Sequence, residues 1–517
     1  MKKNFILLST FAALMVSAIL LTACGDDVQT PEKVGTEQET NTEEITASTI
    51  FSTGDDGTRT SMDTERRFYW SEGDQIYVNT TGDTYQKTSK STLYDNDTKA
   101  DFVLNGIALI EPKCSVMYIG NGTTTATADA SALKVKIEAT QTQSQWGNSD
   151  HLGASGDCGF AEATKNPATG KYSFSLTHKA SYLVLQPYKP TSNTNDWKLM
   201  KIEIIANGTT TLAGKYPFGT GELNVSGATN TANTVTLLCN GNGSTTGGFA
   251  LGTSASAANS IFAVIQPDSH ELTIRYTVKV YGKENVYLLG THGGDFGTMF
   301  FEKKIATRPY NPNGVTTIKH ELFFAPLYYQ WGATDTYFNT YQTNAYDQTT
   351  MAPTQLADPL WNELPNANEM YSYLAYGDPR WDGTTLWSCD GGLTEYTGGA
   401  WLKKRSAIGS QFSDVVGLDG FDMRSVERAY SVNGATYRTG GKPVSTVIDQ
   451  YFLLPALGFY YNGFHYFGSG DCLYWSKSPY PDADGNRSYY LAFDSTAGWV
   501  LNNKREFGFC VTPNWFK

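Results

Sequence analysis

Alternation of apolar and polar residues is the main pattern in the chain between about residues 45 and 322. In the run 272–281, every second position is apolar, and the positions between them carry threonine, arginine or lysine. Successive side chains of a strand point to opposite faces, so this period of two predicts a half-buried strand. Similar runs predict further strands at 100–104, 115–119, 133–137, 172–176, 201–206, 234–238 and 261–266.

Two further patterns support a β-rich chain. The run 182–185 is entirely apolar, which predicts a strand covered on both faces, and 68–78 reads as a strand, a Gly-Asp turn and a second strand. The sequence contains 50 glycines, and charged residues make up 17% of it. This composition is typical of β-sandwiches with many turns and excludes a helical bundle or a wholly disordered chain.

The region 323–517 has a different character. It holds 8 of the 11 tryptophans and 19 of the 32 tyrosines. The segment 361–374 predicts a turn followed by a helix, and aromatic-rich runs at 472–476, 489–494 and 505–511 predict strands. The long stretch 387–445 contains many glycines and serines and matches no pattern that we can assign.

The N-terminus predicts export and lipidation. A short positive segment precedes the apolar run 5–21, which leads directly into Leu-Thr-Ala-Cys ending at Cys24, the lipobox pattern of bacterial lipoprotein signals. A membrane span needs roughly 20 apolar residues, and this run is shorter. We therefore predict that residues 1–23 form a signal peptide and that Cys24 carries the lipid. Residues 24–44 are polar, so we expect a flexible linker there.

Charge and cysteine content narrow the function. The net charge is −12 and the one basic run is 403–405, which argues against nucleic acid or an anionic membrane surface as a partner. Six cysteines remain besides Cys24, and none forms a C-x-x-C pair that would suggest zinc. An exported chain can oxidise its cysteines. Cys472 and Cys510 are the candidate disulfide, and the alternative is that they are reduced, buried small residues.

Three segments resemble the fimbrillin-like proteins of Bacteroides-type bacteria. They are Thr-Arg-Thr at 58–60 followed by Trp-Ser-Glu-Gly-Asp-Gln-Ile-Tyr-Val at 70–78, Ala-Thr-Gln-Thr-Gln at 139–143 with Asp-His-Leu-Gly-Ala at 150–154, and Phe-Ser-Leu-Thr-His-Lys-Ala at 174–180. This resemblance implies two sandwiches in series, at 45–190 and 191–322, and assembly by strand exchange with other fimbrial subunits. It also implies proteolytic trimming after an arginine near the N-terminus, for which Arg59 is the candidate. The acidic residues behind Cys24 resemble the signal that sends such lipoproteins to the outer face of the outer membrane.

The order of motifs in 323–517 is similar to the FISUMP-type (Fibrobacter major paralogous) domain, which is related to C-type-lectin-like folds. The segments that carry the likeness include Tyr-Phe-Leu-Leu-Pro at 451–455, Cys-Leu-Tyr-Trp-Ser at 472–476 and Tyr-Tyr-Leu-Ala-Phe-Asp at 489–494. The predicted fold class is therefore mainly β, with two tandem fimbrillin-type, transthyretin-like sandwiches followed by an α+β C-type-lectin-like domain.

Candidate chemistry is sparse. The six histidines show no metal-binding spacing, and no catalytic motif of a serine hydrolase or a P-loop occurs, so we predict neither an enzyme nor a cofactor. Asp482, Asp484 and Asn486 alternate as in a calcium loop, but position 493, where a bidentate acid is needed, is Phe; a hairpin turn is the alternative. Aromatic faces stack on sugar rings and dominate protein interfaces. The candidate ligand-binding residues are Tyr460, Tyr461, His465 and Tyr466.

These patterns predict a surface-exposed lipoprotein that acts as a tip or accessory subunit of a fimbria, or as an adhesin. Its C-terminal domain would bind a protein or glycan on a host or bacterial surface. The alternative is an outer-surface lipoprotein that captures glycans as nutrients. A formylglycine-generating enzyme, which shares the C-terminal fold type, is disfavoured because its paired active cysteines lie in a motif that we do not find.

The lipobox gives a direct test. Cys24→Ala should release the mature protein from membranes, because the thiol that takes the diacylglycerol is gone. Fractionation of cells followed by immunoblotting measures this, with Cys114→Ala as the matched control. Unchanged membrane association of the Cys24→Ala protein would contradict lipidation at this residue.

Overall fold

The computed structural model describes residues 48–53, 61–62, 68–120, 122–240, 247–324, 328–333, 335–337, 359–417, 419–433, 437, 441–466, 470–512 and 516. All of them belong to one compact unit, Thr46–Lys517. Strands dominate, which confirms the prediction of a mainly β protein. No helix formed by these residues is long and apolar enough to span a membrane.

The first sheet has ten described strands in the order β6-β7-β1-β13-β12-β8-β4-β5-β9, with β14 on β12. Its strands are β1 (Thr49–Thr53), β4 (Tyr77–Thr81), β5 (Thr84–Lys87), β6 (Thr92–Tyr94), β7 (Lys99–Leu104), β8 (Lys113–Tyr118), β9 (Thr127–Asp129), β12 (Gly159–Lys165), β13 (Tyr172–Phe174) and β14 (Thr177–His178). A small ribbon, β2 (Ser61–Met62) with β3 (Phe68–Tyr69), accompanies it.

Strand β1 lies inside this sheet. It runs antiparallel to β7 and parallel to β13. Phe51 at its centre is fully buried and stacks on Tyr172 with ring centroids 5.0 Å apart. Trp70 packs edge-on against Phe102 and Tyr118 in the same core. The first strand of the described chain is therefore a central element of this sheet.

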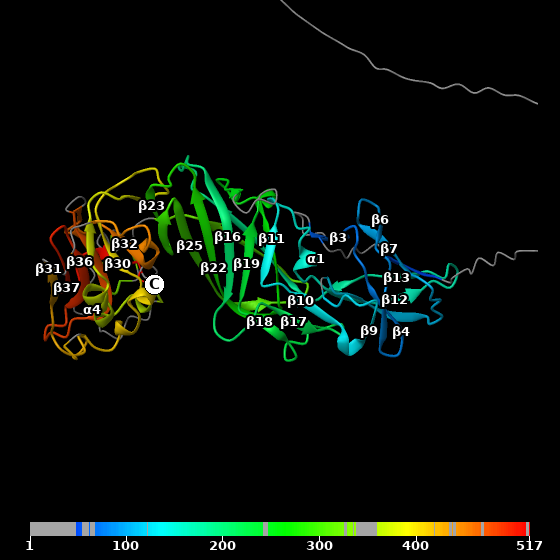
Figure 1. Cartoon of the computed structure of the whole chain (residues 1–517). Coiled ribbons are helices and arrows are strands. Elements are labelled where there is room, and N and C mark those ends of the chain that lie inside the picture. Colours follow the sequence, from blue (N-terminus) through cyan, green and yellow to red (C-terminus); the bar gives the residue numbers. More distant parts are fainter. Residues whose placement is uncertain are drawn as a thin grey trace, which may run out of the picture. The chain divides into compact units, whose positions relative to one another are not determined.

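Three further sheets form the middle of the chain, with α1 (Leu152–Ser155) beside them. The largest has the order β11-β19-β16-β22-β25-β24-β23-β29, and Figure 1 shows β16, β22 and β25 side by side. Its strands are β11 (Thr140–Gln143), β16 (Trp197–Ala206), β19 (Thr234–Cys239), β20 (Phe249–Ala250, on β16), β22 (Asp268–Val280), β23 (Val286–Gly290), β24 (Gly293–Phe296), β25 (Thr298–Tyr310) and β29 (Leu386–Ser388). The others are β10 (Lys134–Ile137), β17 (Ala213–Pro217) and β18 (Thr229–Ala232), and β15 (Ser181–Tyr188), β21 (Ile261–Ile265) and β26 (Val315–Glu321).

The alternation in β22 has the predicted consequence. Ile274, Tyr276, Val278 and Val280 are buried, whereas Arg275, Thr277 and Lys279 between them are partly exposed. Strand pairing also crosses residue 190, because β10, β11 and β15 pair with β17, β19 and β21 from later in the chain.

Two glutamine side chains seal the edge of β21. Gln141 donates to the carbonyl of Val264 at 2.7 Å and accepts from its N–H at 3.0 Å. Gln143 donates to the carbonyl of Ser260 at 3.0 Å and accepts from the N–H of Phe262 at 3.0 Å. Both glutamines are almost completely buried. A buried backbone group without a partner is costly, so these amides do for β21 what a neighbouring strand would do.

The C-terminal region combines two larger sheets and a two-stranded ribbon with short helices. One sheet has the order β27-β38-β35-β36-β37-β31 and the other β28-β30-β32. The strands are β27 (Tyr328–Tyr329), β28 (Arg380–Asp382), β30 (Gly399–Lys403), β31 (Tyr430–Asn433), β32 (Tyr451–Pro455), β35 (Cys472–Pro479), β36 (Arg487–Phe493), β37 (Ala497–Lys504) and β38 (Phe509–Cys510). The helices are α3 (Pro359–Asn362), α4 (Ala367–Tyr376) and α5 (Arg405–Ile408).

This region is joined to the preceding sheet. Strand β29 runs parallel to β23, with Val286 opposite Leu386 and Leu288 opposite Ser388. Trp401 on β30 packs edge-on against Tyr287 at 5.4 Å. Beside this joint the backbone of Gly391 lies so close to the indole of Trp197 that a Cβ would come within 2.0 Å of it. The C-terminal region is therefore packed on the sheet of the middle region.

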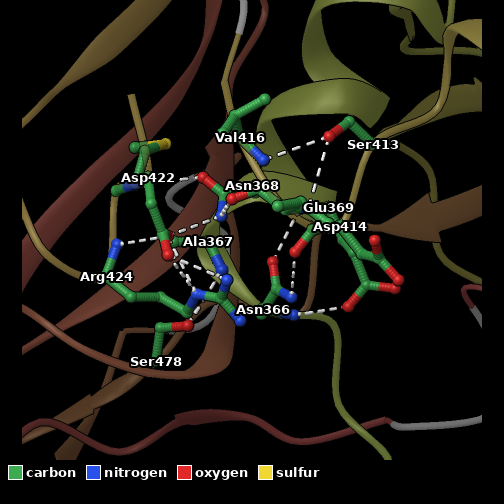
Figure 2. A network of polar contacts seen from close by, with 12 residues as sticks. Asn366, Ala367, Asn368, Glu369, Ser413, Asp414, Val416, Asp422, Arg424 and Ser478 are labelled. Carbon is green, nitrogen blue, oxygen red and sulfur yellow. Dashed lines mark hydrogen bonds and ion pairs between the residues drawn. The ribbon is translucent and has the colours of Figure 1, made fainter. Parts of the chain in front are cut away.

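Polar contacts around the start of α4 hold residues 413–416 and 422–424, which belong to the stretch that the sequence left unassigned (Figure 2). Asn366 caps the helix by accepting from the N–H of Glu369, whose carboxylate accepts from the N–H of Asn366 at 2.8 Å. The Asn368 amide donates to Asp422 at 2.8 Å and to the carbonyl of Val415 at 2.9 Å. The helix predicted within 361–374 is thus confirmed, and its first turn organises a distant loop.

The glutamine seal predicts a large stability effect. Gln141→Leu should lower the free energy of unfolding by about 2–4 kcal/mol, because it leaves two buried backbone groups of Val264 unbonded. Urea unfolding followed by fluorescence measures this. The control is Thr142→Ala on the exposed side of β11, with an effect below about 0.5 kcal/mol. Equal stability of the two variants would contradict the role given to Gln141.

Candidate ligand-binding surface

The predicted binding residues lie on a two-stranded hairpin. β33 (Tyr460–Tyr461) and β34 (Phe464–His465) pair with Tyr460 opposite His465. The two turn residues, Asn462 and Gly463, have φ values of +48° and +79°. Positive φ at both positions defines the tight Asn-Gly turn that fits the twist of paired strands. We call residues 459–466 the aromatic hairpin.

Backbone bonds fix this hairpin to the domain. Tyr460 and Gly508 exchange both hydrogen bonds, at 2.8 and 2.9 Å, and Tyr466 donates to the carbonyl of Phe459 at 2.8 Å. The N–H of Gly463 in the turn donates to the hydroxyl of Tyr337 at 3.1 Å. The hairpin is therefore held in a defined position on the domain.

Stacking between aromatic rings holds the side chains of the hairpin in place. The ring of Tyr460 stacks on the rings of His465 and Tyr337, with centroids 4.2 Å and 5.3 Å apart. Tyr461 stacks on Phe507 at 4.2 Å with an interplanar angle of 9°. Phe459 stacks on Tyr466 at 4.9 Å with an angle of 10°. Such stacking fixes the orientation of each ring without requiring that it be fully buried.

His465 is held by Tyr328. The hydroxyl of Tyr328 donates to the carbonyl of Leu457 at 2.6 Å, so its contact with Nε2 of His465 at 3.2 Å is one in which the imidazole donates. Partial burial among these rings lowers the pKa of His465 below its ordinary value, although a backbone contact with Leu457 acts in the opposite direction. The imidazole is therefore neutral at physiological pH, and the aromatic hairpin carries no formal charge.

The three residues that follow the turn, Phe464, His465 and Tyr466, remain exposed. Phe464 exposes 70% of its surface and Tyr466 43%. Both sit on a backbone that the preceding contacts hold in place. An exposed phenyl ring beside a phenol and an imidazole offers apolar faces and hydrogen-bonding groups together, which is the combination that binds a sugar ring or an aromatic-rich protein interface.

Four residues of this surface were candidates from the sequence alone. Tyr460, Tyr461, His465 and Tyr466 all lie on the aromatic hairpin, where Tyr460 and Tyr461 are partly exposed and serve mainly to support it. Phe464, the most exposed ring, was not singled out. The Asn-Gly pair at 462–463 is the signal that identifies the turn and places Phe464 beside it.

The predicted disulfide is absent from the structure. Cys472 and Cys510 lie on neighbouring strands, but both are free thiols. Cys510 stands opposite Tyr474, two residues along β35 from Cys472, which offsets the two side chains. The Cys472 thiol instead donates to the carbonyl of Leu454 at 3.3 Å. Burial raises the pKa of both thiols, so neither is activated.

The calcium candidates form a turn. Asp482 accepts from the N–H of Gly485 at 2.9 Å and lies 3.7 Å from the guanidinium of Arg487. Within the described part of the chain, no group of three or more His, Cys, Asp and Glu side chains is placed to hold a metal ion. The positions Cys24 and Arg59, predicted for lipidation and proteolytic processing, lie outside the described residues.

Comparison with known proteins gives a weak likeness. No protein-family model matches the chain, and no curated protein matches it. Among solved structures, a candidate cell adhesion protein from Bacteroides ovatus is similar over 53% of this chain and 93% of its own, at 16% identity and a TM-score of 0.30. A fimbrial assembly protein from Parabacteroides distasonis (53% and 91% covered, 10% identity, TM-score 0.27) and the fimbrial anchor protein Mfa2 from Porphyromonas gingivalis (45% and 78%, 11%, 0.20) are also similar. TM-scores this low do not establish equivalent residues or a shared function.

Substitution of an exposed ring of the hairpin should affect the stability of the protein little, whereas substitution of a ring that packs beneath it should lower the stability. Phe464→Ser should alter the free energy of unfolding by less than about 0.5 kcal/mol, because the ring is mostly in water already. Tyr460→Ala should cost about 2 kcal/mol or more, because it removes the ring that Tyr337 and His465 pack against. Thermal unfolding of the two variants compares them. A larger loss for Phe464→Ser would contradict the assignment of the exposed face.

Proposed function

We propose that this chain is a surface-exposed, fimbria-associated adhesion lipoprotein and that its aromatic hairpin binds a carbohydrate on a host or bacterial surface. The observation that carries the proposal is the exposure of Phe464 and Tyr466 on a hairpin whose conformation is fixed by other contacts. Removing apolar surface from water is favourable by roughly 25 cal/mol per Å². A group of large apolar side chains held in an exposed position is therefore best explained by a ligand that covers them.

Carbohydrate fits this surface better than a charged partner does. The aromatic hairpin contains no Asp, Glu, Lys or Arg, and His465 is neutral. A neutral sugar presents C–H faces to rings and hydroxyls to phenols, so it matches both kinds of group that Phe464, His465 and Tyr466 offer. Placement on a C-terminal domain with a lectin-like fold, which the FISUMP resemblance implies, is consistent with this use.

The N-terminal sheets would provide the link to other subunits. Fimbrillin resemblance implies strand exchange after cleavage at Arg59. Such a cut follows β1, which lies between β7 and β13 and buries Phe51, so its loss would expose two strand edges and an apolar groove. An incoming strand from another subunit would restore both kinds of contact. Until that cut is made, the lipid on Cys24 would hold the subunit at the outer membrane; the cut itself would remove Cys24 together with β1.

A glycan array tests the binding proposal. The chain from residue 46 onward, which forms one compact unit, is applied with and without calcium. Saturable binding should fall at least about tenfold in Phe464→Ser and Tyr466→Ser, because each removes an apolar face from the sugar. Val444→Ser, at a site that is 65% exposed, is the matched control and should bind normally.

Host-matrix proteins on the same array distinguish the classes of ligand. Binding to protein alone, with the same dependence on Phe464, would replace carbohydrate by a protein partner. Absence of binding to any probe, or binding that is indifferent to both hairpin variants, would contradict the role of this surface in adhesion.

A further inference from the structure

A concave site that shares no residue with the aromatic hairpin lies in the same C-terminal region. It is a cavity of about 520 Å³, within the size range of small-molecule sites. The connection between α3 and α4, helices α4 and α5, strand β35 and Phe516 meet around it. The lining residues are Glu363, Leu364, Pro365, Glu369, Tyr373, Arg405, Ser406, Lys477 and Phe516.

Strand β35 places Lys477 at this cavity. Its neighbours Ser476 and Ser478 point inward and are almost completely buried. Ser476 donates to the carbonyl of Pro365 at 3.0 Å, and Ser478 accepts from the N–H of Ala367 at 3.0 Å, a contact marked in Figure 2. Lys477 between them lines the cavity, and its own N–H donates to the carbonyl of Pro365 at 3.1 Å. The same contacts fix the start of α4, which forms the adjoining wall.

The carboxylates of the cavity already have partners. Glu369 accepts from Arg405 at 3.2 Å and from the N–H of Asn366, and Glu363 forms an ion pair with Lys304. Lys477 differs, because its ammonium group donates to the carbonyl of Asn362 at 3.4 Å and forms no ion pair with a carboxylate of the described residues. The lining therefore carries one positive charge that no acid of the described chain neutralises.

The other groups of the cavity are of two kinds. Tyr373, Leu364, Pro365 and Phe516 provide an apolar floor. Ser406 brings a hydroxyl, and the two glutamates have lone pairs that can accept from hydroxyls of a ligand. A ligand that satisfies all of these groups needs one carboxylate, several hydroxyls and an apolar face.

We propose that this cavity binds an acidic monosaccharide unit of the hexuronic acid class. The carboxylate pairs with Lys477, the hydroxyls bond to Ser406, Glu363 and Glu369, and a C–H face of the ring rests on the floor formed with Phe516 and Tyr373. A fatty acid leaves the polar rim unbonded, and a neutral sugar leaves Lys477 unpaired. The site is separate from the aromatic hairpin and does not depend on the function proposed for it.

Glucuronic acid and glucose are a matched pair of probes, because they differ at one carbon that carries a carboxylate or a hydroxymethyl group. Binding of each to the chain from residue 46 onward is measured by titration calorimetry and ligand-observed NMR. Wild type should prefer glucuronic acid, and Lys477→Gln should weaken its binding about tenfold or more through loss of a charge-assisted hydrogen bond. Lys504→Gln, at a lysine that already faces Glu506, is the control and should bind like wild type.

A second variant guards against a folding defect. Ser406→Trp should fill the cavity and abolish binding while the circular dichroism spectrum stays that of wild type. Phe464→Ser should bind glucuronic acid normally, which separates this site from the aromatic hairpin. Equal affinity for the two sugars, unchanged binding by Lys477→Gln, or no saturable binding by wild type at tens of millimolar would overturn the proposal.

Discussion

The buried edge of strand β21 is the constraint on which the middle of this protein depends. Its backbone N–H and C=O groups face the interior, where no water can bond them, and Gln141 and Gln143 reach across from β11 to satisfy them. Because the same β11 also pairs with β19, one short segment closes two sheets against each other. The same requirement appears at β23, whose outer edge is covered by β29 from the C-terminal region.

Because the strand edges of the middle region are paired or bonded by side chains, the candidate ligand sites lie outside its sheets. Strands that are paired or sealed on both sides form a stiff body, and the two candidate ligand sites lie on a hairpin and in a cavity at its margin. In the aromatic hairpin, backbone bonds to Gly508 and stacking on Phe507 set the orientation of rings that remain in water. Around the cavity, serines of β35 and the cap of α4 set the walls. At both sites, the side chains that would contact a ligand are held in place by residues that do not themselves contact it.

Much of the strand content follows from the sequence, because burial on one face imposes a period of two. The interior positions of β22 and the fully buried β15 were predictable in this way. The capping pair Asn366 and Glu369, three residues apart, likewise marks the start of α4. These signals are local, and each is carried by a few neighbouring residues.

The features that could not be predicted from the sequence depend on residues that are far apart in the chain. Gln141 and Gln143 look like polar positions of an alternating strand, and their buried bonds to β21 involve residues more than a hundred positions away. The pairing of strands across residue 190 and the offset between Cys472 and Cys510 are also matters of register. Lys477 has no local feature that distinguishes it from a surface lysine, since its position depends on Pro365 and Ala367.

The contact between Gly391 and Trp197 has a consequence for how this protein can diverge. A Cβ at position 391 would overlap the indole, so no residue larger than glycine is accepted while the tryptophan is present. A smaller residue at 197 would relax that restriction but would leave a void beside Phe301, which stacks on the indole at 6.0 Å. In an alignment of related chains, the two positions should therefore change together or not at all, and such covariation would trace the joint between the regions.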